Sequence, residues 1–454
     1  MLQSINPATG LEIARYATLT PSQLEEKLEK AQKTFALWRR SSLTERTQLL
    51  HNLALAYSAH KHRLAHMVTA EMGKTYTSAI AEVDKCIAAF HFYAQSGPDM
   101  LQTTRFSLAA GASVALYWKS LGPILAIMPW NFPLWQTVRF LAPTILAGNV
   151  GLLKHASNVQ GVAGLMEELM VVAGAHDGIF QNIAITSERV ADVIADTRIS
   201  AVTLTGSEKA GSAVAQQAGR YLKKVVLELG GSDPFIVMPS ASLDKAVSQA
   251  VRTRTQNTGQ SCICGKRIIV HKDIYTPFLD AFSAAMEAVK TGDPMNEAMD
   301  MGPLSSLKQR TIVLDQIKEG EKSGCLLLMG GKAHNGSGAY ISAGILTGAP
   351  LDSPFVNEEI FGPIAMLYCA EDIDHAIHIA NKVPFGLGAS VWTQDSLEQE
   401  QFINDVESGM VAINQMLVSS PEMPFGGIKR SGHGRELGSF GVHEFMNLKT
   451  VLNP

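Results

Sequence analysis

The sequence predicts an α/β protein built around two mainly parallel sheets. From about Val114 onward, short apolar runs typical of strands alternate with longer segments of helical periodicity. Such alternation favours a parallel sheet covered by helices on both faces. A second alternating block begins after Gly230 and Gly231, where we place a domain boundary. The chain has 454 residues, 46% hydrophobic and 18% charged, which excludes a mainly disordered protein and suits roughly three domains.

The elements can be predicted in chain order from apolar spacing. Helical patterns begin at Pro21 and Leu43, and a third runs from about Tyr76 to Phe92. In the first alternating block the expected strands are 114–117, 124–127, 150–153, 183–186, 201–204 and 225–229, and the expected helices are 134–147, 161–173, 187–195 and 209–219. In the second block the expected strands are 234–237, 268–270, 326–329, 364–368 and 410–413, and 450–452 is an expected exposed strand in the tail.

Charge and cysteine usage exclude several classes of protein. A formal net charge of −4 argues against a non-specific nucleic-acid binder, and no run of lysines and arginines predicts a membrane patch. The most apolar stretch, 121–153, is interrupted by four prolines, so it lacks the roughly 20 uninterrupted apolar residues of a spanning helix. The first ten residues lack the features of a secretory signal. Five scattered cysteines indicate free thiols, and we expect a cytoplasmic protein.

Cys262 is the candidate nucleophile. It follows Gly259 in a polar loop just before an expected strand, and catalytic residues concentrate in such loops. A cysteine packed as a small apolar residue is the alternative for any single thiol. The pair Cys262-Ile-Cys264 is incomplete as a metal site, because no second pair of ligands has the required spacing. A thiol protease would need a histidine base and an orienting residue, and no local protease motif is present.

Glu228 and Asn131 are the candidate base and oxyanion donor. Glu228 ends an apolar strand before Gly230, where burial should raise its pKa toward neutrality, as suits a general base. Its alternative is an ion pair with Lys223 or Lys224. Asn131 lies between two prolines and two aromatic residues, so its amide is a rigid donor toward a developing oxyanion, or simply a helix N-cap.

A third group of residues suits a dinucleotide. Gly206 and Ser207 follow an expected strand and open a helix, so the backbone and the helix N-terminus can hold a pyrophosphate. Lys154 follows another strand and can reach a ribose or a 2′-phosphate, or it is a solvated surface lysine. The pattern differs from GxGxxG and is weak by itself.

Six ordered motifs make the chain resemble the aldehyde dehydrogenase family over nearly its whole length. They are Pro129-Trp-Asn-Phe-Pro133, Leu204-Thr-Gly-Ser207, Glu228-Leu-Gly-Gly231, Gly259-Gln-Ser-Cys262, Glu358-Glu-Ile-Phe-Gly-Pro363 and Pro424-Phe-Gly-Gly-Ile-Lys-Arg-Ser-Gly432. The resemblance implies two parallel-sheet α/β domains plus a small β oligomerisation flap. The dinucleotide-binding domain would comprise 1–101 and 121–230, the catalytic domain 231–434, and the flap 102–120 and 435–454. Homodimers or homotetramers would follow.

The resemblance also implies roles for individual residues. Cys262 would attack the aldehyde, Asn131 and the Cys262 backbone N–H would hold the oxyanion, and Glu228 would activate water. The implied contacts of NADP or NAD are Trp130, Lys154, Ser157, Gly206, Ser207, Leu229, Glu359 and Phe361. Neither a metal nor any other cofactor is expected.

Within the family the chain resembles the succinate semialdehyde dehydrogenases. Arg139 stands eight residues after Asn131 and is the only charged residue in 121–153, so it would bind a distal carboxylate. A surface arginine is its alternative. Ser419 matches a serine that contacts the same carboxylate. The second thiol, Cys264, also matches, and we hypothesise a labile disulfide with Cys262 under oxidation.

Two departures bear on specificity. A second arginine, six residues before the nucleophile in that subfamily, is replaced by Gln256, which leaves glycolaldehyde and aminoaldehydes as alternative substrates. The usual Lys-Pro-Ser-Glu motif reads Lys154-His-Ala-Ser157. Losing the glutamate removes a charge that would repel a 2′-phosphate, so we expect NADP to be accepted, with NAD as the alternative. A CoA-acylating enzyme or a non-catalytic protein is disfavoured, because the full set of site residues is present.

Overall fold

The computed structural model describes residues 1–109 and 111–453. Within this part of the chain, a six-stranded sheet has the order β19-β9-β8-β5-β6-β7 and is parallel except for β19. Its strands are β5 (Pro123–Met128), β6 (Val150–His155), β7 (Phe180–Asn182), β8 (Ala201–Thr205), β9 (Lys224–Glu228) and β19 (Gly432–His433). The expected alternation of strands and helices is therefore present in the first block.

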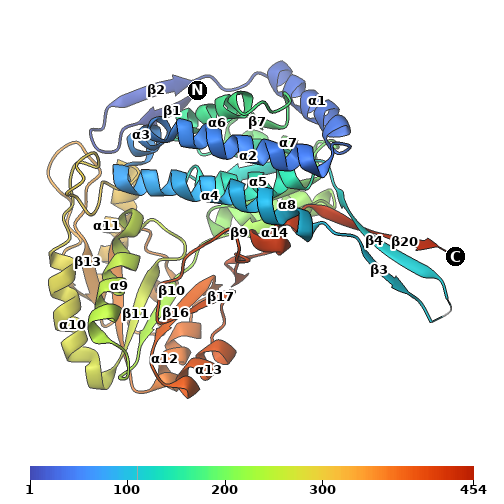
Figure 1. Cartoon of the computed structure of the whole chain (residues 1–454). Helices are drawn as coiled ribbons and strands as arrows, with labels where there is room; N and C mark the ends of the chain where they lie inside the picture. The colour runs from blue at the N-terminus through green and yellow to red at the C-terminus, as the bar shows by residue number, and fades with distance from the viewer. Residues whose placement is uncertain (110, 454) are drawn as a thin grey trace.

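Helices cover this sheet, and four of them precede it in the chain (Figure 1). The early helices are α1 (Pro21–Trp38), α2 (Leu43–Ala59), α3 (Lys61–Met72) and α4 (Tyr76–Met100). The crossover helices are α5 (Trp135–Leu146), α6 (Gln160–Val172), α7 (Val190–Ala195), which follows a short 3₁₀ turn at Ser187–Arg189, and α8 (Glu208–Arg220). A two-stranded ribbon of β1 (Leu2–Ile5) and β2 (Glu12–Tyr16) lies beside them.

A second, seven-stranded sheet in the described residues has the order β12-β13-β14-β11-β10-β16-β17. Its strands are β10 (Asp233–Val237), β11 (Gly265–His271), β12 (Leu326–Met329), β13 (Gly344–Thr347), β14 (Ile364–Ala370), β16 (Gly388–Trp392) and β17 (Met410–Ile413). All pairs are parallel except the edge pair β12–β13. Its helices are α9 (Leu243–Thr255), α10 (Lys272–Glu287), α11 (Leu307–Lys322), α12 (Ile373–Asn381) and α13 (Ser396–Asp405).

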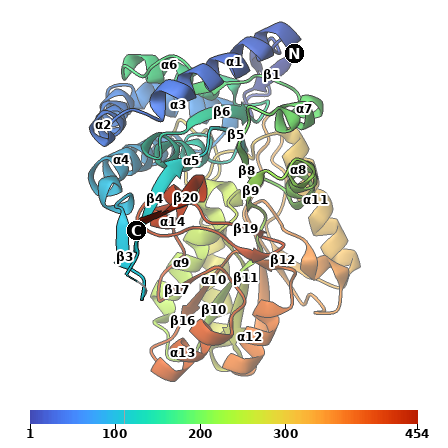
Figure 2. The same cartoon turned by 90° about the vertical axis from the view of Figure 1, so that its right-hand side faces the viewer.

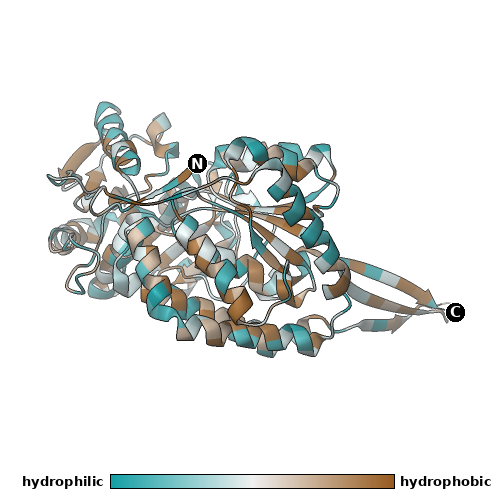
Figure 3. Cartoon of the chain, turned by 90° about the horizontal axis from the view of Figure 1, so that it is seen from above, coloured by the Kyte–Doolittle hydropathy of each residue, from teal (hydrophilic) through white to brown (hydrophobic). Residues whose placement is uncertain are grey.

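A three-stranded sheet projects from the body as an arm (Figures 1 and 3). It has the order β20-β4-β3, with β3 (Thr104–Ser107), β4 (Ser113–Ser120) and β20 (Met446–Asn453) all antiparallel. The tail returns to β4 along eight paired residues, longer than the expected strand at 450–452. Before it, α14 (Gly438–Glu444) packs on α5 and α4 rather than in the arm. A final ribbon pairs β15 (Phe385–Gly386) with β18 (Ile428–Lys429).

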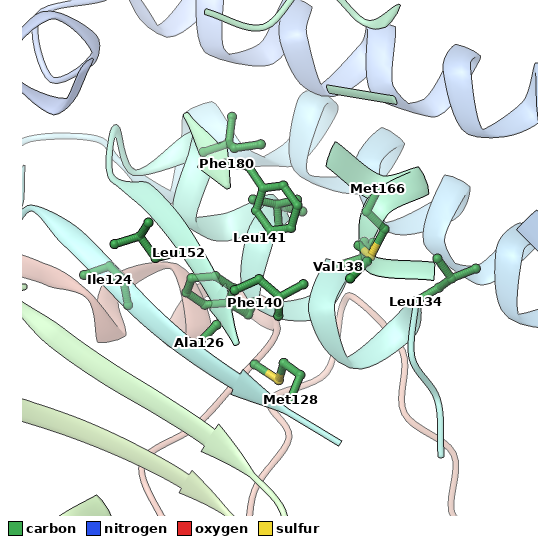
Figure 4. Packing of buried hydrophobic residues seen from close by; sticks show 14 of the residues in the cluster. Ile124, Ala126, Met128, Leu134, Val138, Phe140, Leu141, Leu152, Met166 and Phe180 are labelled. Atoms are coloured by element: carbon green, nitrogen blue, oxygen red, sulfur yellow. The ribbon is translucent and has the colours of Figure 1, made fainter. Parts of the chain in front are cut away.

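The core of the first sheet forms where α5 and α6 pack on the strands. Figure 4 shows Leu134, at the N-cap of α5, and Val138, Phe140 and Leu141 of α5 packed with apolar side chains of the sheet and of α6. The partners labelled there are Ile124, Ala126, Met128, Leu152, Met166 and Phe180. All ten are nearly fully buried. This packing fixes the start of α5, and therefore the segment that carries Asn131, against the ends of β5 and β6.

One predicted strand was wrong. Residues 183–186 were expected to form a strand, but the strand lies at 180–182, and 183–186 have no regular structure. Ile183 and Ile185 are buried in the core, which explains why isoleucine stands at these positions although they are not in a strand. The parallel pairing of Phe180 with Gly151 sets where the strand lies, rather than the local run of isoleucines.

Candidate active site

The loop that carries Cys262 joins α9 to β11 and has an unusual backbone. Asn257, Thr258 and Gly259 all have positive φ, at 56°, 56° and 71°. Asn and Thr are buried there, and a run of left-handed residues costs conformational energy that the surroundings must repay. The Thr258 hydroxyl donates to the Gly302 carbonyl at 3.1 Å. The loop is therefore held in one strained shape just before the thiol.

Asn131 is hydrogen-bonded to this loop. Its side-chain amide donates to the Gln260 carbonyl at 3.0 Å. The Asn257 amide donates to the Asn131 carbonyl and to the same Gln260 carbonyl, at 2.9 Å each. Asn131 is buried, and the residue at the N-cap of α5 is Leu134, so the N-cap alternative is excluded. The structure thus brings Asn131 and the Cys262 loop together from positions about 130 residues apart.

Two buried cations bind the backbone around the thiol. Lys266 donates to the Ser261 carbonyl at 2.8 Å and the Cys262 carbonyl at 2.7 Å, and it pairs with Glu359 at 3.1 Å. Arg254 donates to the carbonyls of Gly259 and Ile360, at 3.2 and 3.1 Å, and to a third at Gly362. Arg254 therefore joins the loop to the segment carrying Glu359. All three bonds come from one terminal nitrogen of the guanidinium, and its Nε and Nη1 have no partner among the described residues.

The Cys262 side chain is half-buried and lines a narrow cavity of about 70 Å³. The same cavity is lined by Arg139 and Ser419 and by the second thiol of Cys264. Burial raises the pKa of the Cys262 thiol to about 12, against the opposing effect of the nearby Arg139 and Lys266 cations. The thiol is therefore protonated at neutral pH in this state. Both thiols are free.

Glu228, at the end of β9, is buried and its two carboxylate oxygens have no hydrogen-bond partner among the described residues. Burial raises the pKa of Glu228 well above its usual value, and the Glu436 carboxylate adds to this effect. Lys223 donates to the Asp196 carbonyl and Lys224 pairs with Glu444, so neither binds Glu228. The structure does not place Glu228 in hydrogen-bonding contact with Cys262.

Arg139 is buried rather than at the surface, with 2% of its area exposed. Its guanidinium pairs with Glu436, donates to the Thr205 hydroxyl at 3.1 Å and lies 4.4 Å from the centre of the Phe425 ring. Glu436 comes from the last twentieth of the chain, and sequence reasoning missed it. Arg139 lines the narrow cavity, but a carboxylate of the protein, Glu436, already offsets its charge.

Helix α4 supplies site residues that sequence reasoning also missed. The Glu82 carboxylate accepts the backbone N–H groups of Leu134 and Trp135, at 2.9 Å each, and so caps α5 from another helix. Lys74, just before α4, pairs with Glu82 and lies 3.9 Å from the centre of the Phe132 ring. Charged residues within and just before a mostly apolar helix could have indicated a functional role. The sequence did not show which part of the molecule α4 contacts.

Lys85, one turn further along α4, reaches the narrow cavity. Its ammonium donates to the Ser419 hydroxyl at 2.8 Å and lies 4.3 Å from the centre of the Trp135 ring. The Trp135 indole N–H also donates to the Ser419 hydroxyl, at 2.9 Å. Burial, with the nearby Arg139 charge, lowers the pKa of Lys85 to about 8.

Six of the eight residues expected to contact a dinucleotide lie at the carboxyl ends of parallel strands of the first sheet. Ser207 is the N-cap of α8, and its hydroxyl accepts the Ala210 N–H at 3.3 Å. Lys154 lies near the carboxyl end of β6. Burial lowers the pKa of Lys154, and the negative charge of the exposed Glu188 raises it. Ser157 is exposed beyond the same strand. This edge is where open α/β sheets bind their ligands.

Aromatic and glycine residues shape the remaining part of this edge. The rings of Trp130 and Phe361 meet edge to face with their centres 5.8 Å apart. Leu229, after β9, fills the space beside Gly211 of α8, where a Cβ would lie 2.5 Å from the leucine. Gly206 donates its N–H to the Glu228 carbonyl at 3.0 Å. Six of the predicted dinucleotide residues therefore lie at the ends of four strands of the first sheet, whereas Glu359 and Phe361 come from the segment just before β14 of the second sheet.

Two kinds of site are not found in the described residues. No group of three or more histidine, cysteine, aspartate or glutamate side chains there is arranged to hold a metal ion. None of the helices in that part of the chain combines the length and the apolar character that crossing a bilayer requires.

Comparison with known proteins gives a consistent result. The model of the aldehyde dehydrogenase family matches residues 1–451. The chain is 46% identical, over 99% of both chains, to a protein of Mycobacterium leprae named succinate-semialdehyde dehydrogenase [NADP(+)]. It is 45% identical, over 99% of both, to succinate-semialdehyde dehydrogenase [NADP(+)] 1 of Mycobacterium tuberculosis. The crystal structure of succinic semialdehyde dehydrogenase from Streptococcus pyogenes in complex with NADP+ covers all of both chains with a TM-score of 0.98 and 36% identity.

Proposed function

The chain belongs to the aldehyde dehydrogenase family, and from this premise we propose that it oxidises succinate semialdehyde to succinate with NADP as the acceptor. One observation carries the choice of substrate. The narrow cavity lined by the Cys262 thiol is also lined by Arg139 and Ser419, so a nucleophile and groups suited to a carboxylate share one small space. The names of the relatives at 45–46% identity agree with this substrate.

Cys262 acts as the nucleophile in this proposal. The thiol, which is protonated at neutral pH, first gives up its proton to water. The thiolate then attacks the aldehyde carbon and forms a thiohemiacetal, and loss of a hydride gives a thioester that water hydrolyses. The Asn131 amide has two N–H groups, of which one is engaged by the Gln260 carbonyl. The other is available to the oxyanion, together with the Cys262 backbone N–H. Removing one such donor typically costs about 10²–10³-fold in kcat.

Glu228 acts as the base that takes a proton from the hydrolytic water. Burial raises the pKa of its carboxyl and so favours the neutral form, which must lose its proton before it can act as a base. Its free carboxylate oxygens leave room for a water molecule as a hydrogen-bond partner. A rise of activity with pH follows from this arrangement.

The residues along the edge of the first sheet fit a dinucleotide. The thirteen-residue helix α8 presents its N-terminus with Ser207 as cap, which suits a pyrophosphate. Lys154 and Ser157 follow β6 and would hold a 2′-phosphate, while Glu359 would bind a ribose and Trp130 and Phe361 would flank the nicotinamide. NADP, when bound, supplies the acceptor for the hydride that leaves the aldehyde carbon.

We further propose that the chain forms homodimers or homotetramers through its arm. Strands β3 and β20 are both edges of the three-stranded sheet, which lies on the side of the body that faces the viewer in Figure 2. Leu448 and Leu452 of β20 are 44% and 63% exposed. An apolar edge strand tends to pair with another chain. Light scattering coupled to size exclusion should give twice or four times 48.9 kDa, and a monomer would overturn this proposal.

A reducing compartment suits the five cysteines, all of which are free. Free thiols persist where glutathione and thioredoxin keep them reduced. We therefore propose the cytoplasm as the location, which fluorescence microscopy of a tagged chain can test.

A substrate panel tests the proposed function. Reduction of NADP or NAD is followed at 340 nm with succinate semialdehyde and with butyraldehyde, which has the same four carbons but no carboxylate. We expect kcat/KM for succinate semialdehyde to exceed that for butyraldehyde by more than tenfold, and NADP to be preferred. Equal values for the two aldehydes would remove the substrate assignment and leave the family assignment intact.

A further inference from the structure

Lys85 occupies the junction of two cavities. It lines the narrow cavity with Cys262, and it also lines a wider neighbouring cavity of about 600 Å³. Phe132 and Gln256 are shared by both linings as well. An aldehyde that places its carbonyl at Cys262 with its chain directed toward the wider cavity would therefore bring its far end to the Lys85 ammonium.

The charge of Lys85 is not offset in the way that the charge of Arg139 is. Arg139 pairs with Glu436, whereas no carboxylate among the described residues forms an ion pair with Lys85. The polar contact of its ammonium is the neutral Ser419 hydroxyl. Removing a cation from water without an anionic partner is costly, and a bound anion offsets that cost. The cavity therefore favours a negatively charged ligand at Lys85.

The hydrogen bonds that Ser419 accepts leave its hydroxyl hydrogen as a donor beside the Lys85 ammonium. A hydroxyl has two acceptor lone pairs and one hydrogen. The Lys85 ammonium and the Trp135 indole N–H are donors only, and both donate to this hydroxyl, at 2.8 and 2.9 Å. Both lone pairs are then occupied, and the hydrogen of Ser419 must be directed to a third group that accepts. A carboxylate oxygen is such an acceptor.

Resting on the proposed function, we propose that Lys85 is a specificity-determining residue, which binds the distal carboxylate of the substrate together with the hydroxyl of Ser419. The ammonium and the hydroxyl offer two donors to one anion, and the Trp135 ring packs against the ammonium, 4.3 Å from the ring centre. Lys85 thus supplies the cation that the glutamine at position 256 does not. Arg139 lies close enough to reinforce the positive potential, as its effect on Lys85 indicates.

The experiment compares Lys85→Met, Lys85→Arg and the control Lys61→Met. Lys61 pairs with Asp84 outside both cavities, so the control removes a nearby ammonium that the proposal does not use. Hydrogen bonds to charged groups are stronger than neutral ones, so Lys85→Met should raise KM for succinate semialdehyde about 10–100-fold. The KM for butyraldehyde should change less than threefold. Lys85→Arg should recover most of the loss, and Ser419→Ala should raise the same KM by a smaller factor.

Succinate as an inhibitor separates this inference from the proposed function. In the wild type, succinate should compete with butyraldehyde, and Lys85→Met should raise its inhibition constant at least tenfold. If the wild type does not prefer succinate semialdehyde, the proposed function fails, and the inhibition constants still decide the role of Lys85. An equal loss for both aldehydes, an unchanged KM in Lys85→Met, or no inhibition of the wild type by succinate would each overturn the inference.

Discussion

The two ends of the narrow cavity are built in different ways. At the Cys262 end, the backbone has left-handed residues at 257–259 and is held by buried side chains, among them Asn257, Arg254 and Lys266. At the Lys85 end, a side chain of α4 meets the segment carrying Ser419, and the Lys85 cation has no anionic partner within the described part of the chain. A reacting atom needs a fixed position, whereas selection of an anion needs unsatisfied donors.

The largest expected effect breaks the Cys262 end. Cys262→Ala should lower kcat for both aldehydes by about 10⁴-fold or more, because it removes the nucleophile that forms the covalent intermediate. Cys264→Ala is the matched control and should keep kcat within about threefold, since its thiol does not react in the proposed mechanism. Steady-state rates at 340 nm measure both variants. A Cys262→Ala enzyme that turns over aldehyde at the wild-type rate would refute the mechanism.

The next largest effect is expected for Arg139→Met, and it distinguishes the role of Arg139 from that of Lys85. Arg139→Met leaves Glu436 buried without its partner, and breaking a buried pair typically costs about 3–5 kcal/mol of unfolding free energy. Activity should fall for both aldehydes through this loss of stability, and further for succinate semialdehyde, whereas Lys85→Met should affect succinate semialdehyde selectively. The double variant Arg139→Met with Glu436→Gln should regain most of the stability. Urea denaturation measures this, and a double variant as unstable as the single one would contradict the assignment of the cost to the unpaired carboxylate.

The smallest effect concerns pH. Burial raises the pKa of Glu228 above its usual value, so kcat should rise as pH increases through that pKa, because the base must be ionised. The stability of the fold should change in the opposite direction and fall as pH increases. The folded state holds the Glu228 proton more tightly than the unfolded state does, so this proton stabilises the fold fully below the unfolded pKa near 4.5. As pH rises from the unfolded to the folded pKa, the free energy of unfolding falls by about 1.4 kcal/mol per pH unit.

Glu228→Gln separates these two consequences. The variant should lose the hydrolytic step, yet at pH 9 it should unfold at a higher temperature than the wild type, because a buried amide has no proton to lose. Thermal unfolding at pH 5 and pH 9 measures the difference. A wild type that is as stable as the variant at both pH values would show that the carboxylate is not held neutral.

Local sequence patterns determined much of this fold. The apolar alternation predicted most strands of both parallel sheets within a few residues, because a buried strand needs an apolar run whatever surrounds it. The prediction of a strand at 183–186 was wrong because it relied on an apolar run alone. Ile183 and Ile185 are apolar because they are buried, and burial alone does not distinguish a strand from a core loop. The pairing with β6 decided the matter.

The candidate site divides along the same line. The sequence alone determined which residue types stand at the strand ends and in the Cys262 loop, because each motif is local. Only the tertiary structure decided which charges meet, since it brings Glu436 to Arg139 across almost 300 residues and turns Lys85 of α4 toward Ser419. Whether a buried charge is offset or free depends on partners that no local pattern specifies, so the electrostatics of the cavity could not be read from the sequence.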